Sequence, residues 1–291
     1  MKRSFGEKLF YISNYAFMAV STILCVAPML YVVMASLIHP NDYMANGITF
    51  PKRFSLYNYK YILSANSRIA NSVMISVYVT VVATTLNLLF TYTAAYVISK
   101  KYLPGRVGIT FFMYFTMLFN GGIVPYYLWM SQLGMVDSLW SIILPGLVSP
   151  WNCFLIRNFL ITLPDSIEES ARIDGASDAL ILAKIILPLS MPVISTIGLF
   201  YAVGHWNEWF GAMIFMNDNS KFPLQLVLRL FLSSNASPVT AEEARLKSLV
   251  QAPSEILKMT AIVISVFPIL IVYPFVQKYF VKGIIAGSIK G

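Results

Sequence analysis

The stretch Leu163–Pro192 reads LPDSIEESARIDGASDALILAKIILPLSMP and predicts two short helices joined by a glycine. Ser166 followed three residues later by Glu169 is a capping box, so we expect the first helix to begin near Ile167. Gly175 is expected in the left-handed conformation that ends many helices. The stretch therefore predicts a compact helical hairpin.

The second helix of this stretch is expected to start from a cap at Ser177 or Asp178 and to run toward Pro188. Acidic and basic side chains are mixed along the stretch, and a mixed polar surface suits the docking of another protein. These charged residues are Glu168, Glu169, Arg172, Asp174, Asp178 and Lys184.

Apolar runs flank the stretch on both sides. Of the 291 residues, 57% are apolar and 12% are charged, against roughly 45–50% and about 25% in globular proteins. Too few polar side chains remain to cover a soluble protein, whereas a membrane span needs about 20 apolar residues in a helix. We therefore expect an all-α integral membrane protein with six transmembrane helices. They are expected at residues 15–37, 72–98, 107–130, 139–160, 191–215 and 257–280.

Helix-breaking residues interrupt several of these expected spans. The tripeptide Asn120-Gly121-Gly122 falls in the third span, and prolines occur at Pro28, Pro125, Pro145, Pro150, Pro268 and Pro274. Each proline alone is explained by a kink that serves packing. Together the breaks favour a channel or transporter, because broken helices are tolerated in a membrane where they line a cavity.

The basic residues indicate the orientation of the spans. The net charge is +8, and an N-terminus inside the cell places twelve of the 21 Lys and Arg residues on the inner side. The other nine fall in two long outer loops, at 38–71 and 216–256, and short cytoplasmic segments are the ones enriched in positive charge. We expect both termini inside, with a cytoplasmic loop at 163–190 and a cytoplasmic tail at 281–291.

Several kinds of enzyme chemistry are excluded by missing residues. His39 and His205 are the two histidines and lie far apart, so an HExxH zinc site is impossible. The sequence has no GxSxG elbow, GxxxxGK phosphate loop or GxGxxG turn. Cys25 and Cys153 fall in apolar runs and offer no disulfide framework. We expect a protein that is not an enzyme and holds no metal.

The loop at 163–190 carries a pattern that identifies a family. The pattern E-A-A-x3-G-x9-I-x-L-P is matched by Glu169, Ala171, Gly175, Ile185, Leu187 and Pro188, with Ser170 in place of the first alanine. With this pattern before its penultimate span, the chain resembles the inner-membrane permease subunits of ABC importers. The resemblance implies a type I ABC importer permease fold.

In that family the loop forms the coupling helix, which docks into a cleft of the ATP-binding subunit. The resemblance implies that this chain binds no cofactor itself, because ATP and magnesium are held by the partner subunits. Docking and the return of the chain to the membrane are then expected from Glu168, Glu169, Ala171, Arg172, Asp174, Gly175, Ile185, Leu187 and Pro188.

The C-terminal tail resembles that of the smaller permease of the maltose importer, which reaches the ATP-binding subunits. Glycine permits an extended chain to approach another backbone closely. The alternative is a basic tail at the membrane surface. The expected contact residues are Lys282, Gly283, Gly287, Ser288, Lys290 and Gly291.

Two further stretches, FNGGIVPYYLWMSQLGMVDSLWSIILP and GHWNEWFGAMIF, resemble the oligosaccharide-importing branch of the family, which includes alginate systems. Aromatic faces stack on sugar rings, and a carboxylate inside a span is costly unless it is functional or paired. The alternative is an interfacial belt of Trp206 and Trp209, with Glu208 paired to His205. The candidate pathway residues are Trp206, Asn207, Glu208, Asn120 and Tyr126.

These residues and the resemblance predict a permease subunit that forms half of a pathway for oligosaccharides in the bacterial inner (cytoplasmic) membrane. Its expected partners are a second permease in a heterodimer, two ATP-binding subunits and an extracytoplasmic solute-binding protein that meets the outer loops, with no nucleic acid. The alternatives are a secondary sugar transporter or channel that acts without ATP, and a membrane-embedded transferase or protease.

Overall fold

The computed structural model describes residues 5–48, 50, 53–64, 68–233 and 255–288, and every regular element within these residues is a helix. The all-α fold expected from the sequence is therefore confirmed. The chain divides into two compact units, which are Met1–Ala70 with Ala252–Val266, and Asn71–Gln251 with Phe267–Gly291.

The first unit is held together by a buried asparagine. Its helices are α1 (Phe5–Ser36), α2 (Pro40–Asn46) and α3 (Tyr57–Ile62), with the start of α16 (Glu255–Ser288). The side-chain amide of Asn58 donates to the carbonyls of Ser36 at 3.1 Å and Ile38 at 2.7 Å. These bonds fasten α3 to the end of α1, whose apolar side chains are otherwise largely exposed, as expected of a surface that faces lipid.

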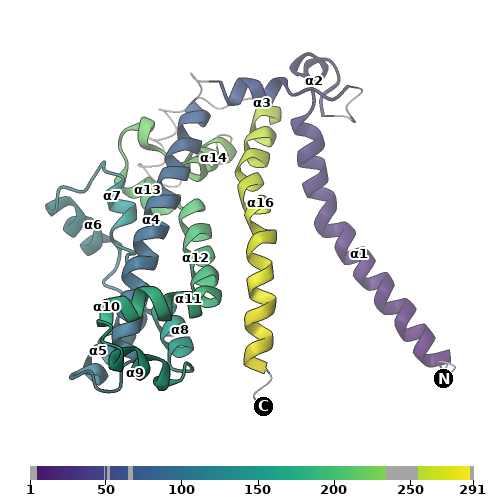
Figure 1. The fold of residues 1–291 in the computed structure, drawn as a ribbon. Coiled ribbons are helices and arrows are strands. Elements are labelled where there is room, and N and C mark those ends of the chain that lie inside the picture. Colours follow the sequence, from purple (N-terminus) through teal and green to yellow (C-terminus); the bar gives the residue numbers. More distant parts are fainter. Residues whose placement is uncertain (1–4, 49, 51–52, 65–67, 234–254, 289–291) are drawn as a thin grey trace. The chain divides into compact units, whose positions relative to one another are not determined.

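The second unit contains most of α4 (Arg68–Ser99), followed by α5 (Arg106–Leu118), α6 (Ile123–Gln132), α7 (Trp140–Ile143), α8 (Pro150–Leu160) and α9 (Asp165–Ile173). It continues with α10 (Asp178–Ile181), the π-helical turn η1 (Leu182–Ile186), α11 (Leu187–Leu189), α12 (Met191–Trp206), α13 (Phe210–Phe215), the 3₁₀ turn η2 (Asn219–Lys221) and α14 (Leu224–Leu232). Helices α5, α8, α9 and α10 gather at one end of α4, and α7, α13 and α14 gather toward the other end (Figure 1).

Polar side chains join α4 to α12 inside this unit. The hydroxyls of Thr91 and Tyr201 lie 2.7 Å apart, and Nε2 of His205 lies 2.7 Å from Oδ1 of Asn87. The amide of Asn87 also donates to the carbonyl of Gly146, in the segment between α7 and α8. Buried polar groups with partners fix one packing arrangement, so α4 and α12 are joined at two levels.

The third expected span is broken rather than straight. Helix α5 ends at Leu118 and α6 begins at Ile123, and their axes differ by 115°. Gly122 has a φ of 85°, and its N–H donates to Oδ1 of Asn120 at 2.8 Å. A helix cannot continue through a residue at positive φ, so the Asn-Gly-Gly tripeptide divides the segment into two helices.

The fourth expected span, 139–160, is also divided. Helix α7 covers Trp140–Ile143 and α8 covers Pro150–Leu160, with Pro145 and Gly146 between them. Proline has no N–H to donate and clashes with the preceding turn, which accounts for the interruption. The fifth span divides likewise, because α12 ends at Trp206 and α13 starts at Phe210.

Helix length and composition give a lower count of spans than six. Within the described residues, three helices are long and apolar enough to cross a membrane, namely Gly6–Ser36, Arg68–Ser99 and Glu255–Pro274. The count rises to five if each of two bent helix pairs is one span, these being Arg106–Leu118 with Ile123–Gln132, and Asp178–Leu189 with Met191–Trp206.

Candidate functional site

Helix α9 opens the first candidate site and begins earlier than the sequence suggested. Its first residue is Asp165, its cap residue is Pro164, and no side chain caps it. The capping box predicted at Ser166 is therefore wrong. Pro164 has the extended backbone of a cap residue, and the carboxylates of Asp165 and Glu168 in the first turn interact favourably with the helix N-terminus, so the helix starts without a capping hydroxyl.

The elbow between α9 and α10 is built as expected. Gly175 has a φ of 81°, and its N–H bonds the carbonyl of Arg172 at 3.0 Å. The next N–H, from Ala176, bonds the carbonyl of Ala171 at 3.0 Å, which completes a Schellman motif. Of the two caps considered for the second helix, Ser177 is the one used, because its Oγ accepts the N–H of Leu180 at 3.4 Å.

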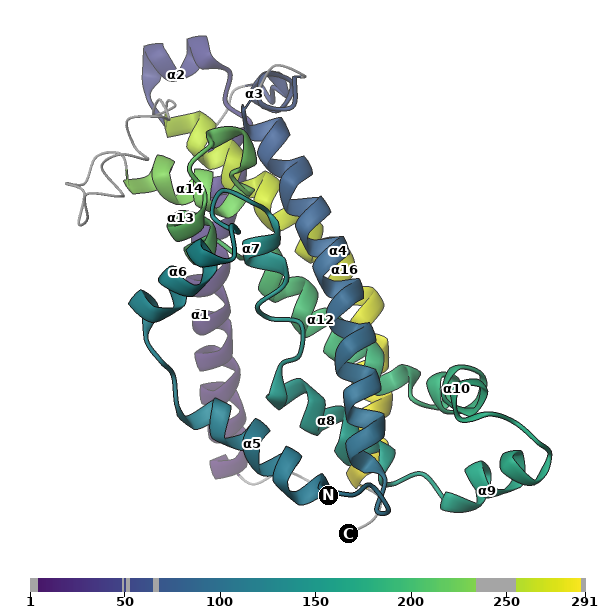
Figure 2. The same ribbon diagram turned by 90° about the vertical axis from the view of Figure 1, so that its left-hand side faces the viewer.

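The second arm of this hairpin is not one regular helix. Helix α10 gives way to the π-helical turn η1, then to α11, and the axis bends by 83° before α12. Pro188 and Pro192 both lie in this region, and neither has a backbone N–H to donate. We call residues 163–190 the knob, because they project from the ends of α4 and α12 (Figure 2).

Apolar side chains fix the underside of the knob. Ala171, Ile181 and Ile186 are buried in a core shared with α4, α8 and α12. The other buried members of this core are Tyr92, Ala95, Tyr96, Ile98, Cys153, Ile156, Leu160, Ile194, Ile197 and Tyr201. A well-packed core transmits displacement rather than absorbing it, so the knob is a rigid attachment.

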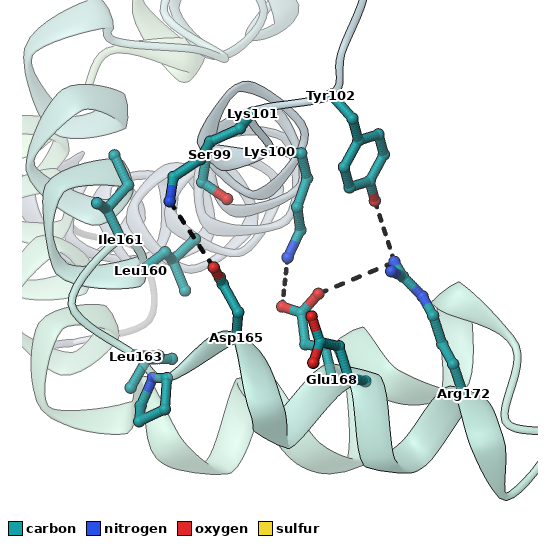
Figure 3. A pocket seen from close by; sticks show the side chains of 12 residues that line it. Ser99, Lys100, Lys101, Tyr102, Leu160, Ile161, Leu163, Asp165, Glu168 and Arg172 are labelled. Atoms are coloured by element: carbon teal, nitrogen blue, oxygen red, sulfur yellow. Dashed lines mark hydrogen bonds and ion pairs between the residues drawn. The ribbon is translucent and has the colours of Figure 1, made fainter.

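Glu168 is the centre of a charged cluster between α9 and the end of α4. Its carboxylate forms an ion pair with Lys100 (Figure 3). It also accepts a hydrogen bond from the hydroxyl of Tyr96 at 3.4 Å. The guanidinium of Arg172 lies 3.9 Å from its second oxygen. The Glu168 side chain is 14% exposed, so this residue of the predicted docking surface faces inward.

Arg172 continues the cluster outward. Its Nη2 donates to the hydroxyl of Tyr102 at 3.0 Å and to Oδ1 of Asp178 at 3.0 Å. The hydrogen bond to Tyr102 and then the one to Asp178 raise the pKa of Arg172 above its usual range. The guanidinium therefore stays charged and holds the start of α10 against α9.

The remaining predicted coupling residues divide by exposure. Glu169, Asp174, Gly175 and Pro188 are exposed, whereas Ile185 and Leu187 are half-buried. A cavity of about 400 Å³ lies between the knob and the end of α4. Its lining is Ser99, Lys100, Lys101, Tyr102, Leu160, Ile161, Leu163, Pro164, Asp165, Glu168, Glu169 and Arg172.

A second cavity, of about 610 Å³, brings together two of the predicted pathway residues. Asn120 and Tyr126 line it at the break between α5 and α6. Trp129 and Phe210 also line it and were not predicted, although their positions in an aromatic-rich stretch were visible in the sequence. The remaining lining residues are Gly121, Gly122, Ile123 and Pro145.

The other three pathway candidates are not among the residues that line this cavity. Trp206 is 5% exposed and lines a separate apolar cavity of about 300 Å³ between α4, α12 and α16. Asn207 is exposed and donates to the carbonyl of Val203 at 2.9 Å, within its own helix turn. The structure therefore does not bring Trp206 and Asn207 to the cavity at Asn120.

Glu208 does not pair with His205, so that alternative is wrong. Its Oε1 accepts the N–H of Gly211 at 2.7 Å, while the ring of His205 bonds Asn87. The belt alternative is wrong for Trp206, which is buried. Trp209 instead makes a cation–π contact, because the guanidinium of Arg229 lies 3.8 Å from the centre of the Trp209 ring.

The predicted tail continues as helix. Helix α16 runs to Ser288, so Lys282, Gly283, Gly287 and Ser288 are helical rather than extended. Lys290 and Gly291 lie outside the described residues, as does most of the predicted outer loop beyond Ser233. In the part of the chain that the structure describes, no three His, Cys, Asp or Glu residues are grouped to hold a metal.

Comparison with known proteins gives consistent matches over nearly the whole chain. Residues 1–286 match the family described as binding-protein-dependent transport system inner membrane component. The polygalacturonan/rhamnogalacturonan transport system permease protein YtcP of Bacillus subtilis (strain 168) is 39% identical over 286 residues, which cover 98% of this chain and 99% of YtcP. Protein LplC of the same organism is 40% identical over 292 residues, which cover 100% of this chain and 98% of LplC.

Among solved structures, a chain of a bacterial ABC transporter involved in the import of the acidic polysaccharide alginate matches with a TM-score of 0.83 and 30% identity. The match covers 96% of this chain and 99% of that one. The chain therefore belongs to the family of binding-protein-dependent transport system inner membrane components, the non-catalytic permease subunits of ABC importers.

Proposed function

We propose that the chain is one of two permease subunits in a complex that imports oligosaccharides across the bacterial cytoplasmic membrane. Family membership supports the import function, and the names of YtcP and of the alginate transporter point to saccharide substrates. ATP is hydrolysed by partner subunits in this family, which argues against the secondary transporter and the embedded enzyme.

The proposed topology has six spans with both termini in the cytoplasm. Three long helices and two bent pairs support five crossings by length and composition. The sixth crossing is α7 with α8, whose short helices would be covered by the partner permease, since irregular backbone is tolerated in a membrane where protein covers it. The charge distribution supports the same orientation.

The single observation that carries the proposed coupling is the construction of the knob. A Schellman elbow and a shared apolar core make it rigid, and Glu169, Asp174 and Gly175 remain exposed on its surface. A rigid projection with an exposed polar tip is suited to docking into an ATP-binding subunit and moving with it as that subunit closes and opens. Closure would then tilt the helices to which the knob is packed.

The proposed sugar contact is the cavity at the break between α5 and α6. Tyr126, Trp129 and Phe210 offer aromatic faces, and Asn120 offers an amide, which together suit stacking on a sugar ring with a hydrogen bond to a hydroxyl. One permease supplies half of such a pathway, so a second, related permease is required as a heterodimeric partner.

Two further contacts complete the proposed complex. The end of α16 and the tail from Lys282 to Gly291 would reach the ATP-binding subunits, and the outer loops would meet an extracytoplasmic solute-binding protein. Deletion of residues 288–291 tests the first contact. The deleted complex is expected to assemble but to lose stimulation of its ATPase by the loaded binding protein, and normal stimulation would overturn the contact.

Assembly itself is the first test of the proposed function. The chain should co-purify in detergent with its second permease and two ATP-binding subunits expressed from the neighbouring genes. The Glu169→Gln variant should lose ATP-binding subunits, whereas Asp42→Asn, a change in the exposed helix α2, should not. Retention of both ATP-binding subunits by Glu169→Gln would contradict docking at the knob.

A further inference from the structure

We propose that Glu168 is a positioning residue that locks the knob onto the end of α4, while its neighbour Glu169 is left to the docked partner. This inference rests on the proposed role of the knob in coupling. It assigns opposite tasks to two adjacent carboxylates that the sequence presents as equivalent.

The helix separates the two carboxylates by direction. Successive residues of an α-helix point about 100° apart, so Glu168 and Glu169 reach the shared cavity from different directions and differ in their contacts. Glu168 points to Lys100 at the end of α4 (Figure 3). It also accepts a hydrogen bond from the hydroxyl of Tyr96. Glu169 lies at the same cavity, but its side chain is exposed to solvent.

We call the contact of Glu168 with Lys100 and Tyr96 the lock, and the place where α9 meets the end of α4 the junction. The lock has charged partners on both sides of the junction. Lys100 follows the last residue of α4, and its ammonium also lies 4.1 Å from the ring centre of Tyr96. On the knob side, Arg172 lies beside Glu168 and bonds Tyr102, two residues beyond Lys100. Two cations of the junction thus converge on the one carboxylate of Glu168.

Burial distinguishes this lock from an ordinary surface ion pair. The side chains of Lys100 and Glu168 are 16% and 14% exposed, so neither charge is well solvated without the other. The neighbouring pair of Lys101 and Asp165 is 3.8 Å apart and 80% and 83% exposed, and such pairs contribute little. The first pair therefore favours one arrangement of α9 on α4, and the second serves as its matched control.

The lock connects to the interior through α4. Asn87 and Thr91 lie about three and a half and two and a half turns before Lys100, and they bond His205 and Tyr201 of α12. A force on α9 would therefore pass through Glu168 into α4 and from there into α12. The apolar core beneath the knob anchors the second arm, so losing Glu168 would leave the knob attached but loosely directed.

The test uses the reconstituted four-subunit complex with Glu168→Gln, Lys100→Met and the double variant, beside the control Asp165→Asn. Glu168→Gln is expected to assemble with both ATP-binding subunits, and substrate transported per ATP hydrolysed should fall about fivefold or more. The double variant should be no worse than either single variant, because it leaves no unpaired buried charge. Asp165→Asn should match the wild type.

Three results would overturn the lock. They are an unchanged transport ratio in Glu168→Gln, additive losses in the double variant, or loss of ATP-binding subunits from Glu168→Gln, which would make Glu168 a docking residue. If Glu169→Gln keeps its ATP-binding subunits, the docking proposal fails, and the lock is then judged by a second measurement that depends on geometry alone.

The second measurement is a spin-label distance. Labels at Lys101 and Asp174, in a complex whose Cys25 and Cys153 are replaced, should give a narrow distance distribution that broadens in Glu168→Gln. A distribution of unchanged width in Glu168→Gln would overturn the lock whatever the knob binds.

Discussion

The ammonium of Lys221 lies 2.8 Å from the carboxylate of Asp137 and 2.7 Å from its backbone carbonyl, although 84 residues separate the two. Asp137 has a φ of 60°, and its other carboxylate oxygen accepts the N–H groups of Asn217 and Asp218 at 3.0 Å each. One aspartate thus ties the loop between α6 and α7 to the loop that follows α13.

Replacing Asp137 by Asn is expected to destabilise the protein. Asparagine tolerates positive φ, so the change removes the charge and the charge-assisted bonds without adding backbone strain. We expect the free energy of unfolding to fall by about 1 to 2 kcal/mol. The loss is no larger because the side chains of Asp137 and Lys221 are each about a third exposed, so water screens their ionic attraction. Thermal unfolding of the purified complex measures the change, with Asp165→Asn as the control, and equal midpoints for both variants would contradict this assignment.

The same aspartate predicts a pH dependence. Partial burial raises the pKa of Asp137, but the hydrogen bonds from Lys221, Asp218 and Asn217 outweigh it and lower the pKa below its usual range. Its stabilisation is therefore present above the unfolded pKa of about 3.9 and is lost as the pH falls through the folded value. The stability gap between wild type and Asp137→Asn should be constant from pH 8 to about pH 5 and close below about pH 4. A gap that closes near neutral pH would show that another group is responsible.

Gly175→Val is expected to uncouple ATP hydrolysis from transport. Apart from its two chain neighbours, no residue has an atom within 4 Å of the place that a β-carbon would take here, so the cost is backbone strain at φ 81° rather than a clash. That strain is of the order of 1 to 3 kcal/mol for a residue other than glycine, and it opens the elbow. Gly108→Val in α5 is the control, because Gly108 is also open but has no positive φ. Normal stimulation of ATPase in Gly175→Val would show that the elbow angle does not matter.

Aromatic substitutions distinguish the two cavities. Trp129→Ala and Phe210→Ala should lower oligosaccharide uptake, since both residues line the cavity at Asn120. Trp206→Ala should instead lower the unfolding temperature, because it empties a buried apolar site. Trp151, which is 61% exposed on α8, supplies a control whose replacement should leave uptake unchanged. Uptake that falls only in Trp206→Ala would move the sugar contact to α12.

Local signals predicted the elements that local chemistry determines. Gly175 and Ser177 act as expected because helix stops and caps involve neighbours within a few residues. The start of α9 was missed because Pro164 occupies the cap position, so Ser166 lies inside the first turn and does not cap the helix. The Asn-Gly-Gly break was visible, but the 115° angle between α5 and α6 was not, because a break in the backbone does not by itself determine the direction of the next helix.

Long-range pairs explain what the sequence could not show. Glu168 and Glu169 look alike until Lys100, 68 residues earlier, is placed beside one of them. The residues next to Asp137 in the sequence do not indicate its role, because its partners lie 80 to 84 residues away. Trp206 and Tyr126 look like two parts of one pathway in the sequence, and the fold places them in separate cavities.

We propose that this permease transports oligosaccharides only when ATP hydrolysis in the partner subunits drives a conformational change that reaches the membrane helices through the knob. The most direct measurement is uptake of a labelled oligosaccharide into proteoliposomes that hold the four-subunit complex, with the binding protein outside and ATP inside. We predict accumulation that requires ATP and the binding protein and is lost in Gly175→Val. Accumulation driven by an ion gradient without ATP, or retained in full by Gly175→Val, would contradict the proposal.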